Sequence, residues 1–141
     1  MKKTLRLFLD TNVWFSALYG SRNCLRLVQA ANKNAIHTVI SPEVLDELLV
    51  NLKKKIPHTL ALFEDMLLTA KPKLIGSPQR IPAFVQKLVD IKDQKIFASA
   101  IEGSVAYFIT GNTRDFKKEQ LKKKTGILIL IPKEAVSALR L

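Results

Sequence analysis

The amino-acid sequence predicts a single α/β domain, residues 1–141, built on a central, mostly parallel sheet of four to five strands. Short apolar runs that suit buried strands alternate along the chain with longer segments that repeat apolar residues at helical spacing. Strands separated by helices favour parallel pairing through right-handed crossovers. Hydrophobic residues make up 48% of the chain and charged residues 25%, which is the composition of a globular domain.

The first predicted strand covers residues 5–9, an apolar run that ends abruptly at Asp10. Thr11-Asn12 can cap a helix over residues 13–18, because a short polar side chain can accept the unpaired backbone N–H groups of a first turn. A second helix is predicted to open at Asn23. Both helices would lie between the first and second strands.

The second predicted strand covers residues 37–40, and the sequence 41–43 that follows it reads Ser-Pro-Glu. This triplet supplies an N-cap, a proline at the first helical position and an acid in the first turn, which together indicate a helix start. The helix continues until it meets Pro57, and another amphipathic helix fits residues 59–69. Residues 72–75 are predicted to be a short extended piece.

The last part of the chain is predicted to hold the remaining strands and shorter helices. In order these are a helix over 83–89, a helix that begins at Asp93 and stops at Gly103, strands over 105–110 and 127–131, and a short helix from Pro132. A turn, Gly111-Asn112-Thr113, follows the strand over 105–110. The strand ends therefore carry polar residues that can build a site.

The net charge of +11 indicates a polyanionic partner. Part of this surplus lies in two runs of adjacent lysines, which are Lys53, Lys54 and Lys55, and Lys122, Lys123 and Lys124. The phosphate backbone of RNA suits such clusters, and salt should weaken this binding steeply. Each run taken alone also fits a solvated helix face.

Cysteine content and hydropathy limit the remaining classes of protein. Cys24 is the only cysteine, so neither an intrachain disulfide nor a cage of thiolates around a metal can form. We interpret Cys24 as a small core residue on a helix. No apolar run approaches the roughly 20 residues that a membrane span needs. We therefore expect a soluble cytoplasmic protein with no membrane partner.

Acidic residues occur where the predicted topology can gather them at one edge of the sheet. Asp10 and Thr110 end strands, Glu47 lies in the helix after the second strand, and Asp93 opens the helix that leads to strand 105–110. Ligands of open α/β sheets bind outside the carboxyl ends of the strands. Clustered carboxylates repel one another unless a cation lies among them, and Mg²⁺ or Mn²⁺ suits such a site without histidine.

Four segments, taken in order, resemble the motifs of the PIN-domain ribonucleases, which include toxins of many bacterial and archaeal toxin–antitoxin pairs. Residues 7–13 read LFLDTNV, like the first motif, in which an apolar strand ends in Asp-Thr-Asn. Residues 41–48 read SPEVLDEL, like the second, whose ligand corresponds to Glu47. Asp93 with the small-residue helix face at 96–100 is similar to the third, and residues 108–116 are similar to the fourth.

This resemblance implies a PIN-like three-layer α/β/α domain that cleaves single-stranded RNA with metal-bound water. Asp10, Glu47 and Asp93 would be the catalytic residues and would hold the ion. Further roles are implied for neighbouring residues, which are Asn112 and Asp115 as metal ligands and Thr11, Asn12 and Thr110 as supporting groups. The resemblance also implies a toxin neutralised by a small antitoxin protein, and a homodimer.

Several of these residues also have simpler interpretations. Asp10 could merely cap a helix, and Asp93 would make a good N-cap, with Asp90 as its nearest rival for the ligand role. Asn112 stands where many PIN relatives carry an aspartate, so it supplies an amide oxygen without the charge. This departure favours an alternative function, in which the chain is a catalytically weak or inactive PIN-fold protein that binds nucleic acid.

Overall fold

The structure, a computed structural model, describes residues 5–31, 33 and 36–141, and its centre is a five-stranded parallel sheet in the order β3-β2-β1-β4-β5. The strands are β1 (Leu5–Leu9), β2 (Ile36–Ile40), β3 (Lys73–Leu74), β4 (Tyr107–Ile109) and β5 (Leu128–Leu130). The order reverses between β1 and β4, since the chain builds outward from β1 to β3 and then returns to the other side of β1. Such a reversal opens a crevice at the carboxyl ends of the two strands.

Helices α1 (Thr11–Tyr19) and α2 (Arg22–Gln29) form the first crossover, and their starts differ from the prediction. The carboxylate of Asp10, rather than Thr11-Asn12, caps α1 by accepting the backbone N–H of Thr11. Helix α2 begins at Arg22, one residue before the predicted start, because the hydroxyl of Ser21 is its N-cap. Cys24 is buried on α2, as expected of a small core residue.

Helix α3 (Pro42–Lys55) begins where the Ser-Pro-Glu signal predicted, with the hydroxyl of the buried Ser41 accepting the backbone N–H of Val44 at 3.3 Å. A single 3-10 turn, η1 (Pro57–Thr59), then leads into α4 (Leu60–Ala70). Helix α4 ends at Lys71, whose φ of 46° is left-handed, and the chain turns there into β3.

The second half of the chain contains four further helices and two 3-10 turns. These are α5 (Ala83–Leu88), η2 (Ile91–Asp93), α6 (Gln94–Glu102), η3 (Thr113–Asp115), α7 (Lys118–Thr125) and α8 (Pro132–Ala138). The sequence prediction did not include α7. Its sequence, KEQLKKKT, buries a single residue, Leu121, so it lacks the repeated apolar spacing that would have identified it.

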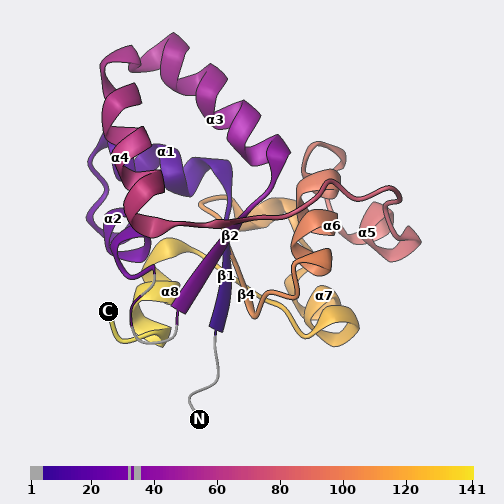
Figure 1. Cartoon of the computed structure of the whole chain (residues 1–141). Coiled ribbons are helices and arrows are strands. Elements are labelled where there is room, and N and C mark those ends of the chain that lie inside the picture. The colour runs from indigo at the N-terminus through magenta and orange to yellow at the C-terminus, as the bar shows by residue number, and fades with distance from the viewer. Residues whose placement is uncertain (1–4, 32, 34–35) are drawn as a thin grey trace.

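Two layers of helices cover the two faces of the sheet (Figure 1). Helices α1, α2, α4 and α8 lie on one side, and α5, α6 and α7 lie on the other. On the α6 side, the ring of Phe97 packs against that of Phe108 at 5.2 Å between centroids, and Phe108 stacks on Phe8 at 5.1 Å. On the opposite side, Trp14 of α1 meets Phe63 of α4 edge to face at 6.4 Å. The expected three-layer α/β/α fold is therefore confirmed.

The centre of the sheet is the most deeply buried part of the described chain. Leu7, Phe8 and Leu9 of β1 and the facing Phe108 and Ile109 of β4 are all 0% exposed. Burial on both faces explains why these strands appear in the sequence as continuous apolar runs rather than as alternating ones. None of the helices in the described ranges is both long enough and apolar enough to cross a bilayer.

Candidate metal centre

Asp10 lies at the point where the strand order reverses. Its backbone N–H donates to the carbonyl of Ile109 at 2.9 Å, so the residue extends the pairing of β1 with β4 by one step. The residue is only 6% exposed, and both of its carboxylate oxygens accept hydrogen bonds. The backbone N–H of Thr11 donates to Oδ1 at 2.8 Å, and the hydroxyl of Thr110 donates to Oδ2 at 3.0 Å. Asp10 is therefore both a helix cap and the centre of a polar cluster.

Thr11 connects Asp10 to Glu47 of α3. While its backbone N–H binds Asp10, its hydroxyl donates to Oε2 of Glu47 at 2.8 Å. The carboxylate of Glu47 also raises the pKa of Asp10 by charge repulsion, which shows that the two acids lie near each other. Segments 37 residues apart in the chain thus place two predicted ligands side by side.

Asp93 ends η2 and precedes α6, yet its side chain makes no capping hydrogen bond. Instead, Asp90 caps the preceding turn by accepting the backbone N–H of Lys92 at 3.2 Å. One carboxylate oxygen of Asp93, Oδ2, is buried without a hydrogen-bond partner in the described part of the chain. Capping therefore accounts for Asp90, and it does not account for Asp93.

The pKa of Asp93 is raised to about 7. Burial is the largest cause, followed by a hydrogen bond with the side chain of Asp115 and by the negative charges of Asp10 and Asp115. The pKa of Asp10 is also raised, chiefly by burial and further by the charges of Glu47 and Asp115, although its bonds from Thr11 and Thr110 oppose this. The four acids therefore act on one another electrostatically. A cation among them would relieve this repulsion.

Asn12 joins the start of α1 to the loop after β4. Its side-chain amide donates to the hydroxyl of Thr110 at 3.2 Å, and its Oδ1 accepts the backbone N–H of Gly111 at 2.8 Å. A Cβ atom at residue 111 would lie 3.2 Å from Oδ1 of Asn12, so a glycine suits this close approach. Thr110 is fully buried, and its hydroxyl also accepts the backbone N–H of Asn112.

Asn112 and Asp115 form a pair at the rim of the cluster. The amide of Asn112 donates to Oδ2 of Asp115 at 2.8 Å, and the ammonium of Lys92 lies 3.3 Å from the same oxygen. The side chain of Asp115 is 17% exposed, whereas that of Lys92 is 65% exposed. Asn112 therefore orients Asp115, and Lys92 brings a positive charge to the site that the sequence interpretation did not anticipate.

A hard divalent cation suits this donor set in chemistry, because the donors are carboxylate oxygens and one of them has no partner. Within residues 5–31, 33 and 36–141, however, no three His, Cys, Asp or Glu side chains are arranged closely enough to enclose a metal ion. An ion held here would keep several water ligands, as Mg²⁺ commonly does.

The remaining predicted residues lie outside this cluster. Lys53, Lys54 and Lys55 are exposed in the last turn of α3, and Lys122, Lys123 and Lys124 are exposed in the last turn of α7.

Glu43, the acid of the Ser-Pro-Glu helix start, is a further acid, which lies in the first turn of α3 and faces α6. Both of its carboxylate oxygens are buried without a hydrogen bond among the described residues, and Oε1 lies 3.7 Å from Nζ of Lys95. Its only signal in the sequence is its place one helical turn before Glu47.

Comparison with known proteins identifies relatives of this fold. A model of the PIN domain family matches residues 6–114. A chain of VapBC2 from Rickettsia felis, solved bound to a promoter DNA fragment, is similar in fold with a TM-score of 0.62 and 18% identity over 90% of this chain and 98% of that one. A chain of a toxin–antitoxin complex from Klebsiella pneumoniae has a TM-score of 0.60 and 24% identity over 79% of this chain and 90% of that one. No curated protein sequence matches.

The matched segment contains three of the four acids of the cluster, which are Asp10, Glu47 and Asp93. The fourth, Asp115, directly follows its last residue. It also spans strands β1 to β4, between which the site is built. The chain belongs to the PIN domain family.

Proposed function

We propose that the protein is a metal-dependent endoribonuclease that cleaves single-stranded RNA. The observation that carries this proposal is the bonded cluster at the β1–β4 reversal. There Asp10 accepts hydrogen bonds from Thr11 and Thr110, and the hydroxyl of Thr11 donates to Glu47. The charge of Asp10 also raises the pKa of Asp93. PIN domains are generally nucleases, and a cluster of repelling carboxylates in this position supports a hydrolytic site that uses a divalent cation.

Asp10, Glu47 and Asp93 would hold Mg²⁺ or Mn²⁺, with Asp115 and Asn112 at the rim. When bound, the cation lowers the pKa of a water molecule and offsets negative charge on a phosphoryl group. The protein's own part is to fix the donors before substrate arrives. Thr11 and Thr110 orient Asp10 and Glu47, while Asn112 orients Asp115. Side chains held in this way lose little freedom when they bind an ion.

The surplus of basic side chains would bring RNA to this acidic site. A phosphodiester approaches carboxylates against repulsion, and a net charge of +11 provides an attraction that acts over about a Debye length. The exposed lysines at the ends of α3 and α7 are the proposed contacts with the sugar–phosphate backbone.

We further propose that this ribonuclease is the toxin component of a type II toxin–antitoxin system and acts in the cytoplasm. The support is that two structures of similar fold come from toxin–antitoxin assemblies. The proposed partner is a small antitoxin protein that blocks the acidic site, and the toxin itself is proposed to form a homodimer. Sedimentation of the purified protein alone would test the homodimer.

Incubation of the purified protein with an unstructured RNA oligonucleotide tests the proposed activity. We expect cleavage with Mg²⁺ or Mn²⁺, and no cleavage when EDTA is present in excess. Asp10→Asn and Asp93→Asn, which are matched in size to the native residues, should each abolish cleavage while the circular dichroism spectrum stays unchanged. Normal cleavage by Asp10→Asn would show that the site has been assigned to the wrong residues.

The alternative is a PIN-fold protein that binds nucleic acid with little or no cleavage. The amide at position 112 favours it, because Asn112 donates its N–H to Asp115 and adds no negative charge for a cation. Calorimetric titration with Mn²⁺ separates the two functions. A nuclease gives a binding signal that Asp10→Asn removes, whereas the alternative predicts no signal that depends on this carboxylate.

A further inference from the structure

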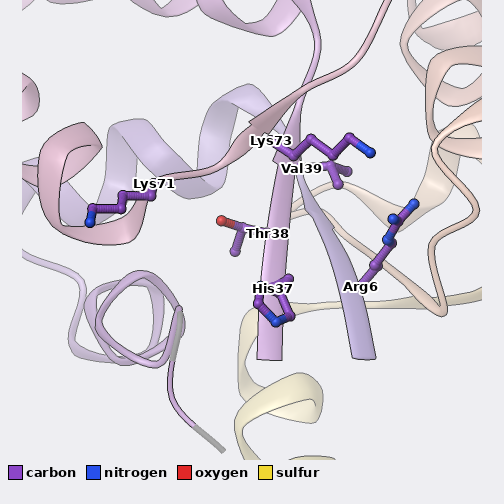
Figure 2. Close-up of a pocket in the computed structure, with 6 residues that line it drawn as sticks. All are labelled: Arg6, His37, Thr38, Val39, Lys71 and Lys73. Carbon is purple, nitrogen blue, oxygen red and sulfur yellow. The ribbon is translucent and has the colours of Figure 1, made fainter. Parts of the chain in front are cut away.

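A basic pocket lies beside β2, and its lining includes no residue of the acidic cluster (Figure 2). Its volume is about 200 Å³, and it is lined by Arg6, His37, Thr38, Val39, Lys71 and Lys73. Strand β3 pairs with β2 only at Val39 and Ile40, so no described strand covers the edge of β2 beside His37 and Thr38. The proposed nuclease site uses none of these residues.

The lining carries positive charge that nothing described in it neutralises. Arg6, Lys71 and Lys73 are cations, His37 is an imidazole that can donate a hydrogen bond, and the lining includes no acid. The ion pairs found in the described part of the chain involve Lys92 and Lys95 instead. Gathered cations without carboxylates repel one another, and an anion that enters the pocket removes this repulsion.

The register of the strands brings two pairs of these side chains together. Arg6 of β1 and His37 of β2 are register partners, and so are Val39 and Lys73, so each pair projects from the same face of the sheet. One guanidinium nitrogen of Arg6 donates to the carbonyl of Gly103 at 3.0 Å, which fixes the group and leaves its other N–H donors available. In Figure 2, Arg6 and Lys73 lie on one side of β2 and Lys71 lies on the other.

Thr38 adds a polar group that lacks a partner. The residue is 2% exposed, and its hydroxyl makes no hydrogen bond within the described residues. Figure 2 shows the hydroxyl oxygen turned toward the side on which Lys71 lies. A buried hydroxyl without a partner destabilises a protein, so an acceptor arriving from the pocket would be favourable for the fold as well.

We propose that this pocket binds a phosphate group. Phosphate matches the lining because its oxygens accept from guanidinium, ammonium, imidazole and hydroxyl donors, all of which occur there, and the charge-assisted bonds among these are the strong ones. The volume accommodates a phosphate group, and the imidazole of His37 is the one aromatic ring among the lining residues. Three cations beside a single small ring favour a phosphate over a nucleobase.

The source of the phosphate that we favour is the backbone of the RNA strand, several nucleotides from the point of cleavage. Arg6 lies four residues before Asp10 on the same strand, a separation of about 13 Å at ~3.3 Å per residue. An RNA strand bound at this distance would be anchored without contacting the acidic cluster at that point. This choice of source rests on the proposed function, whereas the phosphate chemistry of the pocket does not.

The two histidines of the chain provide a direct test with inorganic phosphate as the probe. His37 lines the pocket, and His58 lies in η1, outside it. In an NMR titration with EDTA present, phosphate should shift the imidazole signals of His37 and leave those of His58 unchanged, with sodium sulfate and sodium chloride as comparison salts. Equal movement of both signals, or no movement up to tens of millimolar phosphate, would overturn the proposal.

Two substitutions remove the charge of the pocket with little risk to the fold. Lys71→Asn suits the left-handed backbone at this position, and Lys73→Gln lies on an exposed edge strand. The double variant should weaken phosphate binding about tenfold or more. The matched control is Lys87→Gln with Lys133→Gln, which removes the same charge outside the pocket and should leave the His37 titration unchanged.

Fluorescence anisotropy with a labelled single-stranded RNA in EDTA identifies the source. In the NMR titration, RNA should displace phosphate from His37. In the anisotropy titration, the double variant should reduce the slope of log Kd against log salt by about 1.4, at ~0.7 for each lost contact. If phosphate shifts His37 but RNA does not displace it, the RNA source is wrong and the pocket takes free phosphate. Failure of RNA cleavage in separate assays would affect the proposed function alone.

Discussion

Thr11 holds two proposed metal ligands with two different groups of one residue. Its backbone N–H binds Asp10 and its hydroxyl binds Glu47, each at 2.8 Å, so the distance between the two carboxylates depends on this threonine. The residue is only 7% exposed, which protects both bonds from competition with water. Its role is therefore to position the two acids.

Replacement of Thr11 by Val tests this role, since valine keeps the shape and removes the hydroxyl. We expect Thr11→Val to reduce cleavage at least about tenfold, because the loss of one hydrogen bond to a carboxylate is worth roughly 1.5–3 kcal/mol. Thr11→Ser retains the hydroxyl and should recover most of the activity. Equal activity of the valine and serine variants in single-turnover assays would contradict the positioning role.

Asp93 makes stability depend on pH when no metal is present. Its pKa is about 7 in the folded protein, above the ordinary value of 3.8, so between these values the folded chain binds more protons than the unfolded one. The free energy of unfolding should therefore fall as pH rises from about 4 to 7. Because Asp93 is partly exposed, we expect solvent screening to reduce its contribution to about 1–2 kcal/mol.

Thermal melts in EDTA at pH 5 and pH 8 measure this contribution. Asp93→Asn should lose less stability than the native protein between these pH values and should be the more stable of the two at pH 8. Addition of Mn²⁺ at pH 8 should raise the Tm of the native protein and not that of Asp93→Asn. Parallel pH dependence in the two proteins would contradict the account of Asp93.

At the residue scale, the sequence leads to three acids, whose role as metal ligands stays a prediction, and it gives no signal for two cations that pair with other acids nearby. Asp10, Glu47 and Asp93 follow from motif positions and from the rule that polar residues gather at strand ends. Lys92 and Lys95 could not be identified, since the ion pair of Lys92 with Asp115 depends on how η3 packs beside η2, and that of Lys95 with Glu43 depends on how α3 packs beside α6. Such contacts between distant segments leave no local pattern in a sequence.

At the scale of elements, α3 carries Glu47 and its start determines where that side chain lies. The N-cap Ser41 is fully buried and accepts the backbone N–H of Val44, and proline follows it. Ser21 caps α2 in the same way, at the same distance of 3.3 Å to Cys24, but α2 carries no residue of the site. The two serines therefore form a matched pair.

Ser41→Ala and Ser21→Ala should each lower the free energy of unfolding by about 1 kcal/mol, because both remove an N-cap. Only Ser41→Ala should also weaken Mn²⁺ binding, by several-fold, since it loosens the helix that holds Glu47. Urea unfolding and calorimetry measure the two effects separately. Equal Mn²⁺ affinity in both variants would show that the start of α3 does not position the site.

The element predictions succeeded where local chemistry is strong and failed where tertiary packing decides. The Ser-Pro-Glu signal located the start of α3 to the residue, and the apolar runs located β1, β2, β4 and β5, while β3 lies within the short extended piece predicted over residues 72–75. Strand β4 is shorter than predicted, with Tyr107–Ile109 in place of residues 105–110, because a strand ends where its neighbour no longer pairs with it. Helix α7 was not predicted because it buries a single side chain, Leu121, and so lacks the repeated apolar spacing of the other helices.

At the scale of the whole molecule, acidic side chains gather at the β1–β4 reversal, and runs of lysines lie at the ends of two helices. The lysine runs lie at the C-terminal ends of α3 and α7, where the helix dipole also favours positive charge. Lys55 additionally lies 5.5 Å from the centre of the Phe15 ring, a distance that suits a cation–π contact. Part of each run therefore serves the fold, and RNA binding requires its own test.

Replacement of each lysine run by glutamine measures its contribution to RNA binding. If Lys122, Lys123 and Lys124 all contact phosphates, the slope of log Kd against log salt should fall by about 2 in the triple variant. The same change is expected for the run at residues 53–55. Anisotropy in EDTA excludes cleavage, and a variant whose slope equals that of the native protein would assign its run to a solvated helix face.

The most direct test of the account is a crystal of the native protein soaked in Mn²⁺, with anomalous scattering recorded at the manganese edge. We predict an anomalous peak at the β1–β4 reversal, within ligand distance of carboxylate oxygens from both Asp10 and Asp93, and no such peak in Asp10→Asn. A peak elsewhere, or Mn²⁺ bound equally well without the Asp10 carboxylate, would contradict the proposal that these acids form a metal centre.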